Sequence, residues 1–444
     1  MTIFISILAV VLMLGIFAAA HELGHFFVAR LFKVKAYEVS VFLGPALFKW
    51  RRKEVDYSIR CIPVGAYVRF NDFDNEGNPV VSDDPALLIN QPRWKRLIIA
   101  LAGPFVNFLL GIIIFSAFFC VTGYETLKLG ATEEGLQMYG LDYEIGDTVV
   151  AVDGHKVFTS ADFVLYFDFK DAGEPTVLTI RSKETGKKHD ITLNPEVSER
   201  GLIGITRNQT LDPETSGWVV SGNSNPASDL QAGDIVTAVN GIAIADYEAL
   251  DDFFKNTKEG DIVEVTYIRD GKEIKEEIPL VGGTYVNGMG ITLLPEKVTG
   301  VKSFFSTVYN GIKTPFSVIN MTKMVISHAI SGEVKAYQVI SGPIGVVNIV
   351  DNVVAEEQTS TTLKLSTLVT LAAFVTVALS ISNMLPLPGL DGAQIIILLV
   401  EMVIGRKLPQ KIENMITVIG FFVMILLLLL AFASDITKIV VEGW

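Results

Sequence analysis

The sequence has 444 residues, of which 50 % are hydrophobic, and its mean hydropathy is +0.43. This length predicts several domains, and so apolar a composition argues against an ordinary soluble protein and predicts membrane spans. The formal net charge of −13 argues against nucleic acid as the main partner. We expect both cysteines, Cys61 and Cys120, to be reduced, because no disulfide framework is evident.

The first expected span covers roughly 3–32 and contains the motif HExxH. No charged residue precedes the motif and no cleavage site follows the apolar run, so we interpret the segment as a retained helix and not as a signal peptide. His21 and His25 are four positions apart on one helix face, where two imidazoles can hold one metal ion. Glu22 lies about 100° around the helix, within reach of a water molecule beside that metal. Ionisable groups in an apolar span are costly and usually mark function.

The region from about 37 to 70 is too polar to span a membrane but contains strand-like stretches. The alternation in Asp56–Ile62 and a turn at Gly44-Pro45 predict a β-hairpin that dips into the membrane, where protein or water must satisfy its backbone. An ordinary cytoplasmic loop is the alternative, and the residues alone favour it. Gly65, in the apolar stretch that follows, is a candidate substrate-binding or oxyanion residue.

Three further spans are expected, each near or above the ~20 residues needed to cross: roughly 97–123, 363–385 and 415–433. The first of these contains Gly103, Pro104 and Asn107. Asn107 is a candidate substrate-binding or oxyanion residue, although its small neighbours indicate a packing role.

Basic residues predict the orientation of these spans. They are frequent between the first and second spans, and the loop between the third and fourth spans contains Arg406, Lys407 and Lys411. The positive-inside bias places both loops in the cytoplasm, and residues from about 124 to 362 then lie outside.

The external region contains an internal repeat. The motif GDTVVAVDG at 146–154 matches GDIVTAVNG at 233–241, and Gly204-Ile205 matches Gly290-Ile291 at nearly the same offset. The pattern GDxVxxV[DN]G resembles bacterial PDZ domains, which bind extended peptides by strand addition. Two β-sandwich spacers are the alternative. Both Gly-Ile pairs are candidate peptide-binding residues, but a permuted strand order leaves their place in each groove open.

These observations predict a polytopic α-helical membrane protein with four spans, a membrane-associated β-hairpin and an inserted tandem of PDZ-like α+β domains. Residues 304–330 form an amphipathic segment that we expect on the outer membrane surface. The chain is accordingly divided into five parts: 1–123, 124–208, 209–296, 297–362 and 363–444.

A catalytic zinc normally has three protein ligands, and HExxH supplies two. The remaining histidines, His155, His189 and His328, lie outside on the predicted topology and are interpreted as surface residues. Asp391 is the only acid between Glu357 and Glu401. It follows the third span at the membrane depth expected for HExxH, so we predict it as the third ligand. Capping of the next helix is the alternative role, and one carboxylate can serve both.

Pro386 and Pro388 precede Asp391 and cannot continue a helix. We therefore expect the third span to unwind there and to expose backbone that can pair with an extended substrate. Asn383, one turn earlier, is a candidate for orienting substrate or binding an oxyanion; helix–helix hydrogen bonding is the equal alternative.

Three motifs in order resemble those of the site-2 proteases, which are intramembrane zinc metalloproteases: HELGH at 21–25, GPFVN at 103–107 and NxxPxPxLDG at 383–392. The tandem PDZ-like repeats and SGPIG at 341–345 are similar to the regulator of sigma-E protease branch of that family. The resemblance covers nearly the whole chain. One departure is Gly389, where relatives often have a bulkier residue.

The resemblance implies Zn²⁺ held by His21, His25 and Asp391, with Glu22 as the catalytic residue. It also implies a re-entrant β-segment near 37–70 and a bacterial inner-membrane location with the PDZ domains in the periplasm. The implied substrates are single-span membrane proteins, namely an anti-sigma factor already trimmed outside by a site-1 protease, and remnant signal peptides. Lipid bilayer is a partner and nucleic acid is not.

The sequence therefore predicts a zinc metalloendopeptidase that cuts within or near membrane spans under the control of its PDZ domains. A membrane metal-ion transporter and a PDZ-bearing scaffold without catalysis are the alternatives. A transporter usually needs a polar path through several spans and leaves Glu22 without a role, and the intact HExxH argues against an inert scaffold.

Overall fold

The computed structural model describes residues 2–70, 82–130, 142–171, 173–195, 197–207, 212, 215–269, 271–286, 292–355 and 361–442. The chain forms two compact units. Unit 1 contains 1–127, 157–166 and 293–444, and unit 2 contains 128–156 and 167–292.

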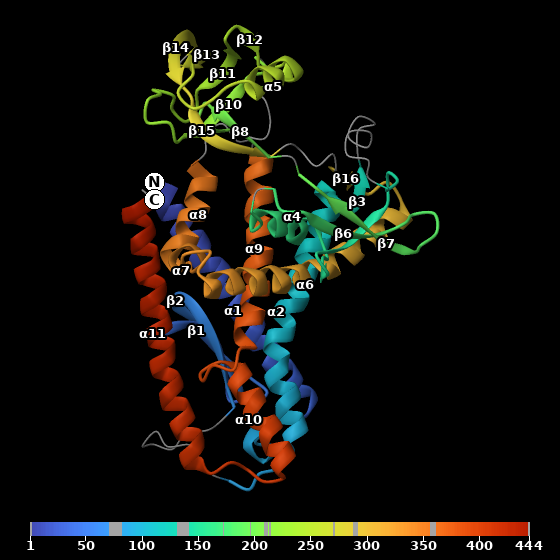
Figure 1. Ribbon diagram of the computed structural model, residues 1–444. Helices are drawn as coiled ribbons and strands as arrows, with labels where there is room; N and C mark the ends of the chain where they lie inside the picture. Colours follow the sequence, from blue (N-terminus) through green and yellow to red (C-terminus); the bar gives the residue numbers. More distant parts are fainter. Residues whose placement is uncertain are drawn as a thin grey trace. The chain divides into compact units, whose positions relative to one another are not determined.

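Long apolar helices dominate unit 1 and run alongside one another in Figure 1. They are α1 (Thr2–Leu31), α2 (Arg93–Thr122), α9 (Thr361–Asn383), α10 (Asp391–Ile404) and α11 (Gln410–Glu442). Four segments of these helices are long and apolar enough to cross a membrane: Ile3–Leu31, Arg93–Thr122, Lys364–Asn383 and Val418–Val441. The structure thus contains four candidate spans, as the sequence predicts. The fourth lies further along the chain than predicted, because its last part tolerates charged residues that face protein.

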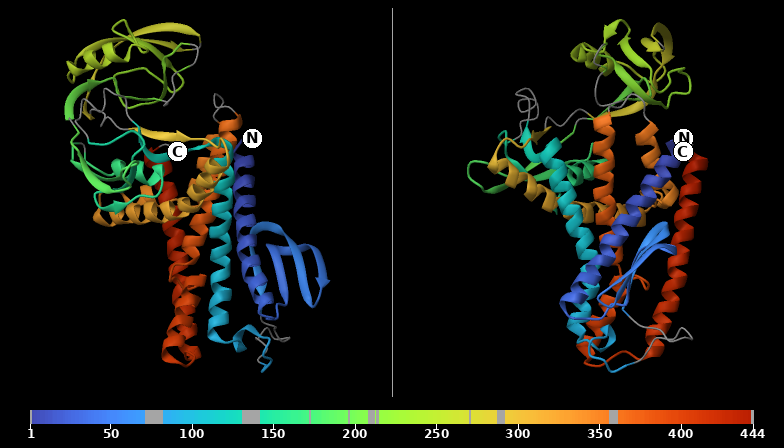
Figure 2. Two further views of the ribbon diagram at one scale, coloured as in Figure 1. Left: turned by 90° about the vertical axis from the view of Figure 1, so that its right-hand side faces the viewer. Right: turned by 180° about the vertical axis from the view of Figure 1, so that it is seen from behind.

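A bent hairpin of two long strands, β1 (Glu38–Arg52) and β2 (Val55–Arg69), lies beside α1 (Figure 2). The start of β1 lies between the two ends of β2, because Glu38 pairs with Asp56 on one side and with Arg69 on the other. Residues 66–69 are therefore an outer edge of this sheet. The hairpin that the alternating residues predict is confirmed, and the alternative of an ordinary loop is wrong; its depth in a membrane stays a prediction.

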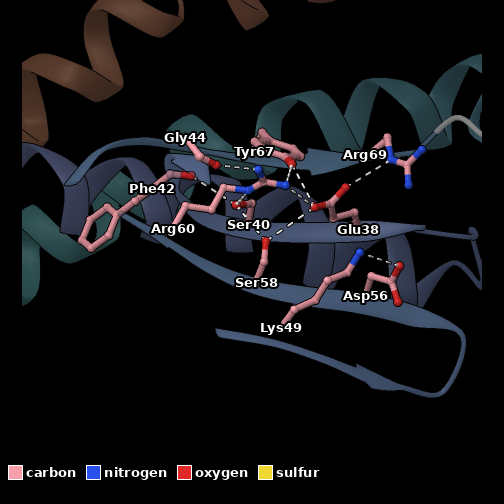
Figure 3. A network of polar contacts seen from close by, with 10 residues as sticks. All are labelled: Glu38, Ser40, Phe42, Gly44, Lys49, Asp56, Ser58, Arg60, Tyr67 and Arg69. Carbon is pink, nitrogen blue, oxygen red and sulfur yellow. Dashed lines mark hydrogen bonds and ion pairs between the residues drawn. The ribbon is translucent and has the colours of Figure 1, made fainter. Parts of the chain in front are cut away.

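The two faces of this sheet differ, since side chains alternate along a strand. Val39 and Val55 are buried against Phe26 of α1. The opposite face carries the polar network of Figure 3, in which the Arg60 guanidinium and the Tyr67 hydroxyl donate to the same Glu38 oxygen at 2.8 and 2.9 Å. This network joins the middle strand to both of its neighbours and so holds the outer edge in place.

Helix α6 (Val301–Ser331) crosses the direction of the spans within unit 1 (Figure 1). The segment predicted to be amphipathic is thus helical. Buried Asp162 in α4 (Ser160–Asp168) accepts a hydrogen bond from the Asn320 amide of α6 at 3.2 Å. The described part of unit 1 also contains the shorter helices η1 (Leu88–Asn90), α7 (Ala336–Val339) and α8 (Pro343–Ala355).

Buried Asp435 of α11 closes the bundle by binding the start of α8. Its carboxylate accepts backbone N–H groups from Gly342, Ile344 and Gly345 at 2.8, 3.0 and 3.1 Å. The first N–H groups of a helix have no partner within the helix, so this side chain satisfies them from another element. The motif SGPIG is therefore the docking point of α11.

Twelve of the strands after α2 form two six-stranded sheets of one design. The first has the order β16-β3-β4-β6-β7 with β5 on β4, and the second has the order β9-β10-β11-β13-β14 with β12 on β11. The first sheet comprises β3 (Tyr124–Gly130), β4 (Thr148–Val152), β5 (His155–Lys156), β6 (Thr176–Arg181), β7 (Lys188–Leu193) and β16 (Thr292–Glu296). The second comprises β9 (Ile205–Arg207), β10 (Trp218–Asn223), β11 (Ile235–Val239), β12 (Ile242–Ala243), β13 (Ile262–Arg269) and β14 (Lys272–Pro279), with helix α5 (Tyr247–Lys255) between β12 and β13.

The second repeat is inserted within the first, since β16 follows the whole second sheet in the chain. Strands β8 (Val197–Leu202) and β15 (Val281–Val286) pair with each other at the two ends of the insertion. The predicted domain boundary between 208 and 209 is therefore wrong for two strands: β9 pairs with the second sheet and β16 with the first. The offset between the repeats cannot reveal the nested arrangement, because it has the same value whether the repeats follow one another or one is inserted in the other.

The repeated Gly-Asp motif has the same structural role in both copies. Asp147 accepts backbone N–H groups from Glu144 and Lys183, at 3.0 and 2.8 Å. Asp234 accepts the N–H of Gln231 at 2.7 Å and a hydrogen bond from the Arg269 guanidinium at 2.6 Å. Each aspartate, 2 % exposed, fixes the turn before a core strand. Both cysteines are free, as predicted.

Candidate metal centre and active site

Three side chains able to bind a metal meet where α1 approaches the start of α10. His21 Nε2 and His25 Nε2 lie 2.9 and 3.3 Å from Asp391 Oδ2, and 3.1 Å from each other. Both histidines are buried, because the helical spacing of four residues turns them to the same inner face of α1. The structure thus brings the three predicted ligands together from two segments far apart in the sequence.

This donor set fits zinc. Three atoms separated by 2.9–3.3 Å leave a central position about 2 Å from each, which is the length of a bond from zinc to nitrogen or oxygen. His25 Nδ1 lies 2.7 Å from the carbonyl oxygen of Ile99. Since a carbonyl only accepts, Nδ1 carries the proton and the lone pair of Nε2 faces the cluster.

Two glycines allow α1 and α2 to come close enough for this arrangement. A Cβ on Gly24 would lie 2.6 Å from the carbonyl oxygen of Ala102, and a Cβ on Gly103 would overlap the His25 imidazole and lie 2.7 Å from His21 Cε1. Neither position tolerates a side chain, so the GP motif of the second span shapes the metal centre without supplying a ligand.

The carboxylate of Glu22 lies beside the centre and is held by the hairpin. Its Oε2 accepts the backbone N–H of Val68 at 3.1 Å. This N–H belongs to the outer edge of the sheet, so it is available to a neighbour outside the hairpin. Glu22, His25, Asp391 and Val68 line one cavity of 540 Å³, which gives the carboxylate a space in which water and substrate can meet it.

The chain is not helical between α9 and α10, as Pro386 and Pro388 predict. Gly392 lets this segment fold back tightly, because a Cβ there would overlap the carbonyl groups of Met384 and Leu385. Helix α10 begins at Asp391, and its N-cap position is occupied by Leu390. Asp391 therefore lies inside the first turn of α10 and is not its N-cap, so the capping alternative is wrong.

The remaining candidates lie outside the cluster of ligands. Asn383 ends α9 half-buried, and Gly65 lies in β2 with a φ of +68°. Asn107 is fully buried in α2, and both polar atoms of its side chain are without a hydrogen-bond partner among the described residues. No hydrogen bond or ion pair among the described residues joins these three residues to the metal ligands.

The other three histidines also lie elsewhere. His155 is exposed, His189 contacts the carbonyl oxygen of Asp142 at 3.1 Å, and His328 lies 3.4 Å from Glu333. Within the described part of the chain, the ligand atoms of His21, Glu22 and His25 also lie within 4.8 Å of one another.

Sequence reasoning missed the two backbone groups that orient the site, the N–H of Val68 and the carbonyl of Ile99. Backbone groups carry no residue signature. One signal was present for Ile99, which lies four positions before Gly103 and so on the same face of α2. No comparable signal exists for Val68, because its position depends on the register of a bent hairpin.

A separate cavity of 410 Å³ lies in unit 2 beside the edge strand of the second sheet. Gly204 and Ile205 line it together with Tyr247 and Phe254 of α5. The corresponding pair Gly290 and Ile291 lies outside the described residues. One of the two predicted peptide-binding pairs is thus at a groove between a strand edge and a helix.

Comparison with known proteins adds the family. The sequence model of peptidase family M50 matches residues 9–427. "Zinc metalloprotease RasP" of Shouchella clausii is 24% identical over 451 residues, which are 98% of this chain and 99% of that protein. "Putative zinc metalloprotease NMA0084" of Neisseria meningitidis is 26% identical over 456 residues, with the same coverage of both chains. A relative from Vibrio cholerae, also named "Putative zinc metalloprotease", is 26% identical over 480 residues.

Proposed function

Because the chain belongs to peptidase family M50, the site-2 proteases, and is a zinc metalloprotease, we propose that it hydrolyses peptide bonds within or near the membrane spans of single-span membrane proteins. The observation that carries this proposal is the convergence of His21, His25 and Asp391, two of which lie on a helix long and apolar enough to cross a membrane.

Each residue of the centre has a defined task. When bound, zinc supplies a Lewis acid that polarises the scissile carbonyl and acidifies the attacking water. Glu22 accepts the proton of that water as general base and delivers it to the leaving amine. The N–H of Val68 holds the Glu22 carboxylate in the cavity, and the carbonyl of Ile99 holds the His25 imidazole in its metal-binding tautomer.

The substrate must be extended at the cut, because a helical peptide keeps its carbonyl groups within its own hydrogen-bond ladder. Two exposed backbone stretches flank the centre: the sheet edge at 66–69 and the non-helical segment at 384–390. The sheet edge offers N–H and C=O groups to an extended chain. The non-helical segment offers mainly C=O groups, because most of its N–H groups are bonded locally. Gly65, Pro386, Pro388 and Asn383 belong to or border these stretches, which supports their role as substrate-contacting positions.

The protein works as a multi-pass membrane protease of a bacterial inner membrane, with its centre toward the cytoplasm and the two repeats in the periplasm. The positive loops support this orientation. Its clients are single-span proteins such as an anti-sigma factor trimmed by another protease, and remnant signal peptides. The groove at Gly204 and Ile205 supports a PDZ-type role for the second repeat.

The repeats act as a size filter that admits only clients whose external domain has been removed. Activation by a newly made C-terminus is the alternative. Deleting about 127–293 in the full-length protein distinguishes them: cleavage of untrimmed client supports the filter, whereas loss of all cleavage supports activation.

The central test is incubation of the purified protein with a single-span peptide, with and without a chelator, followed by mass spectrometry of the products. We expect products whose formation the chelator abolishes. Glu22→Gln should keep its zinc and lose cleavage. Full turnover by a correctly folded Glu22→Gln variant contradicts the general-base assignment, and an intact peptide with zinc-loaded protein favours the transporter or scaffold alternatives.

A further inference from the structure

A third cavity, of 260 Å³, lies at the end of α1 beside the turn between β1 and β2. It is separate from the metal centre, although α1 contributes to both. Its walls come from two elements and combine cationic with aromatic side chains: Phe26, Phe27, Arg30, Arg52, Lys53 and Tyr57.

The three cations of this cavity are not held by ion pairs within the described part of the chain. Arg30, Arg52 and Lys53 have no ion pair there. The nearby acid Asp56 is engaged by Lys49 and Arg51 at 3.6 and 3.7 Å (the Lys49 pair is drawn in Figure 3). Three cations around one cavity repel one another, so an anion between them lowers their energy.

The turn that carries Lys53 is a second, independent observation. Lys53 and Glu54 have φ angles of +48° and +66°, so both central residues of this two-residue hairpin turn are left-handed. Asparagine and glycine adopt that conformation more easily than lysine and glutamate. Strained residues of this kind concentrate at binding sites, where the strained conformation places a side chain that the ligand needs.

The place of the cavity in the molecule identifies the anion. Arg30 is in the last turn of the first span, where a helix leaves the hydrocarbon and meets lipid headgroups. Phe27 is 62% exposed and Tyr57 lines the same cavity, so apolar and aromatic groups stand beside the cations. A phospholipid has the matching form, with a phosphate for the cations and an acyl glycerol part for the aromatic rings.

We propose that this cavity binds the phosphate headgroup of an anionic phospholipid. The headgroup bridges Arg30 of α1 to Arg52 and Lys53 of the hairpin. It thereby fastens the sheet, whose outer edge holds Glu22, to the helix that carries the HExxH motif. This binding goes beyond the proposed proteolysis and does not depend on it.

Native mass spectrometry of the purified full-length protein tests the proposal. The protein is released from detergent after equilibration with phosphatidylglycerol, with phosphatidylcholine, or with soluble glycerol phosphate. We expect retention of phosphatidylglycerol alone. The variant R30Q/R52Q/K53Q should retain less of it by on the order of tenfold to a hundredfold. Retention of glycerol phosphate in place of the lipid would assign the site to a soluble phosphate and overturn the lipid proposal.

The matched control is R406Q/K407Q/K411Q, which removes three exposed basic residues from the loop after α10 and the first turn of α11. It should retain the lipid as the unmodified protein does. An equal loss in both triple variants would reveal nonspecific attraction by net charge and overturn the site. Undiminished retention by R30Q/R52Q/K53Q would do the same. Zinc content, measured on every variant, verifies that the fold around the metal centre is intact.

Discussion

At the scale of single residues, the metal centre depends as much on the absence of side chains as on its ligands. His21, His25 and Asp391 supply the donor atoms, but Gly103 is what allows α2 to lie directly against both imidazoles. The carbonyl of Ile99 reaches His25 only because of this close approach. The GP motif of the second span is therefore part of the centre in a geometric sense.

We predict that Gly103→Ala lowers the zinc content of the purified protein by roughly tenfold or more, because its Cβ displaces the His25 ring from the cluster. Elemental analysis of detergent-purified protein measures this directly. Gly111→Ala is the control on the same helix: its Cβ would press on the buried Val377 side chain of α9, a contact that involves no metal ligand, so zinc should be retained. Equal zinc loading of both variants would show that the centre tolerates a wider gap between α1 and α2.

At the scale of elements, the hairpin shows what the sequence can and cannot predict. The alternation of residues 56–62 predicts strands. The HExxH and NxxPxPxLDG motifs predict the metal ligands, and the two prolines of the second motif predict the break between α9 and α10. The register of β1 against both ends of β2 was not predictable, because it depends on contacts with α1 that have no sequence signature. The support of Glu22 by Val68 follows from that register and was missed with it.

The polar face of the hairpin yields a test of this support. Tyr67→Phe removes the hydroxyl that donates to Glu38 and loosens the edge that holds Glu22, at a cost of about 1 kcal/mol. We expect a several-fold lower kcat with normal zinc content, measured by peptide cleavage and elemental analysis. Lys49→Gln removes a long, exposed ion pair of the same sheet and should leave kcat unchanged. Similar kcat values for both variants would exclude a role for the network in catalysis.

The second sheet carries a pH-dependent element. Burial acts to raise the pKa of Asp234, but hydrogen bonds from Arg269 and from the Gln231 backbone, with the Arg269 charge, outweigh it and hold the pKa below its usual value. A carboxylate with a lowered folded pKa contributes stability above its unfolded pKa of about 3.9, and this contribution is lost as the pH falls through the folded value.

We therefore expect the second sheet to open more readily below about pH 4. In Asp234→Asn the sheet should be less stable at neutral pH and show less further loss on acidification. Hydrogen exchange pulsed at one fixed pH, after incubation of the full-length protein at a series of pH values, measures the opening of β11 and β13. If the unmodified protein and Asp234→Asn give parallel pH profiles, Asp234 is not the group that makes the second sheet pH-dependent.

At the scale of the whole molecule, the nested repeats explain why the chain order misleads. The second sheet interrupts the first, so the two ends of the first repeat are far apart in sequence. The matching sequence motifs identify both copies of the repeat. They do not show to which sheet the strands at the ends of each copy belong. The four candidate spans are easier to predict from the sequence, because the length and hydropathy of a segment are enough to identify them. Buried polar residues join the last span to the rest: Asp435 binds the start of α8, and Ser434 donates to the carbonyl groups of Tyr337 and Ile340.

Removing this junction should weaken the helical bundle of unit 1. Asp435→Ala leaves the N–H groups of Gly342, Ile344 and Gly345 unsatisfied within protein, and we expect a loss on the order of 2–3 kcal/mol, because these are hydrogen bonds to a charged group. The midpoint of thermal unfolding in detergent should fall. Asp435→Asn keeps one acceptor oxygen and should fall less. If Asp435→Ala unfolds at the same temperature as the unmodified protein, the remaining contacts of α11 suffice to hold it, including the hydrogen bonds of Ser434 and the packing of Gly420 on Pro388.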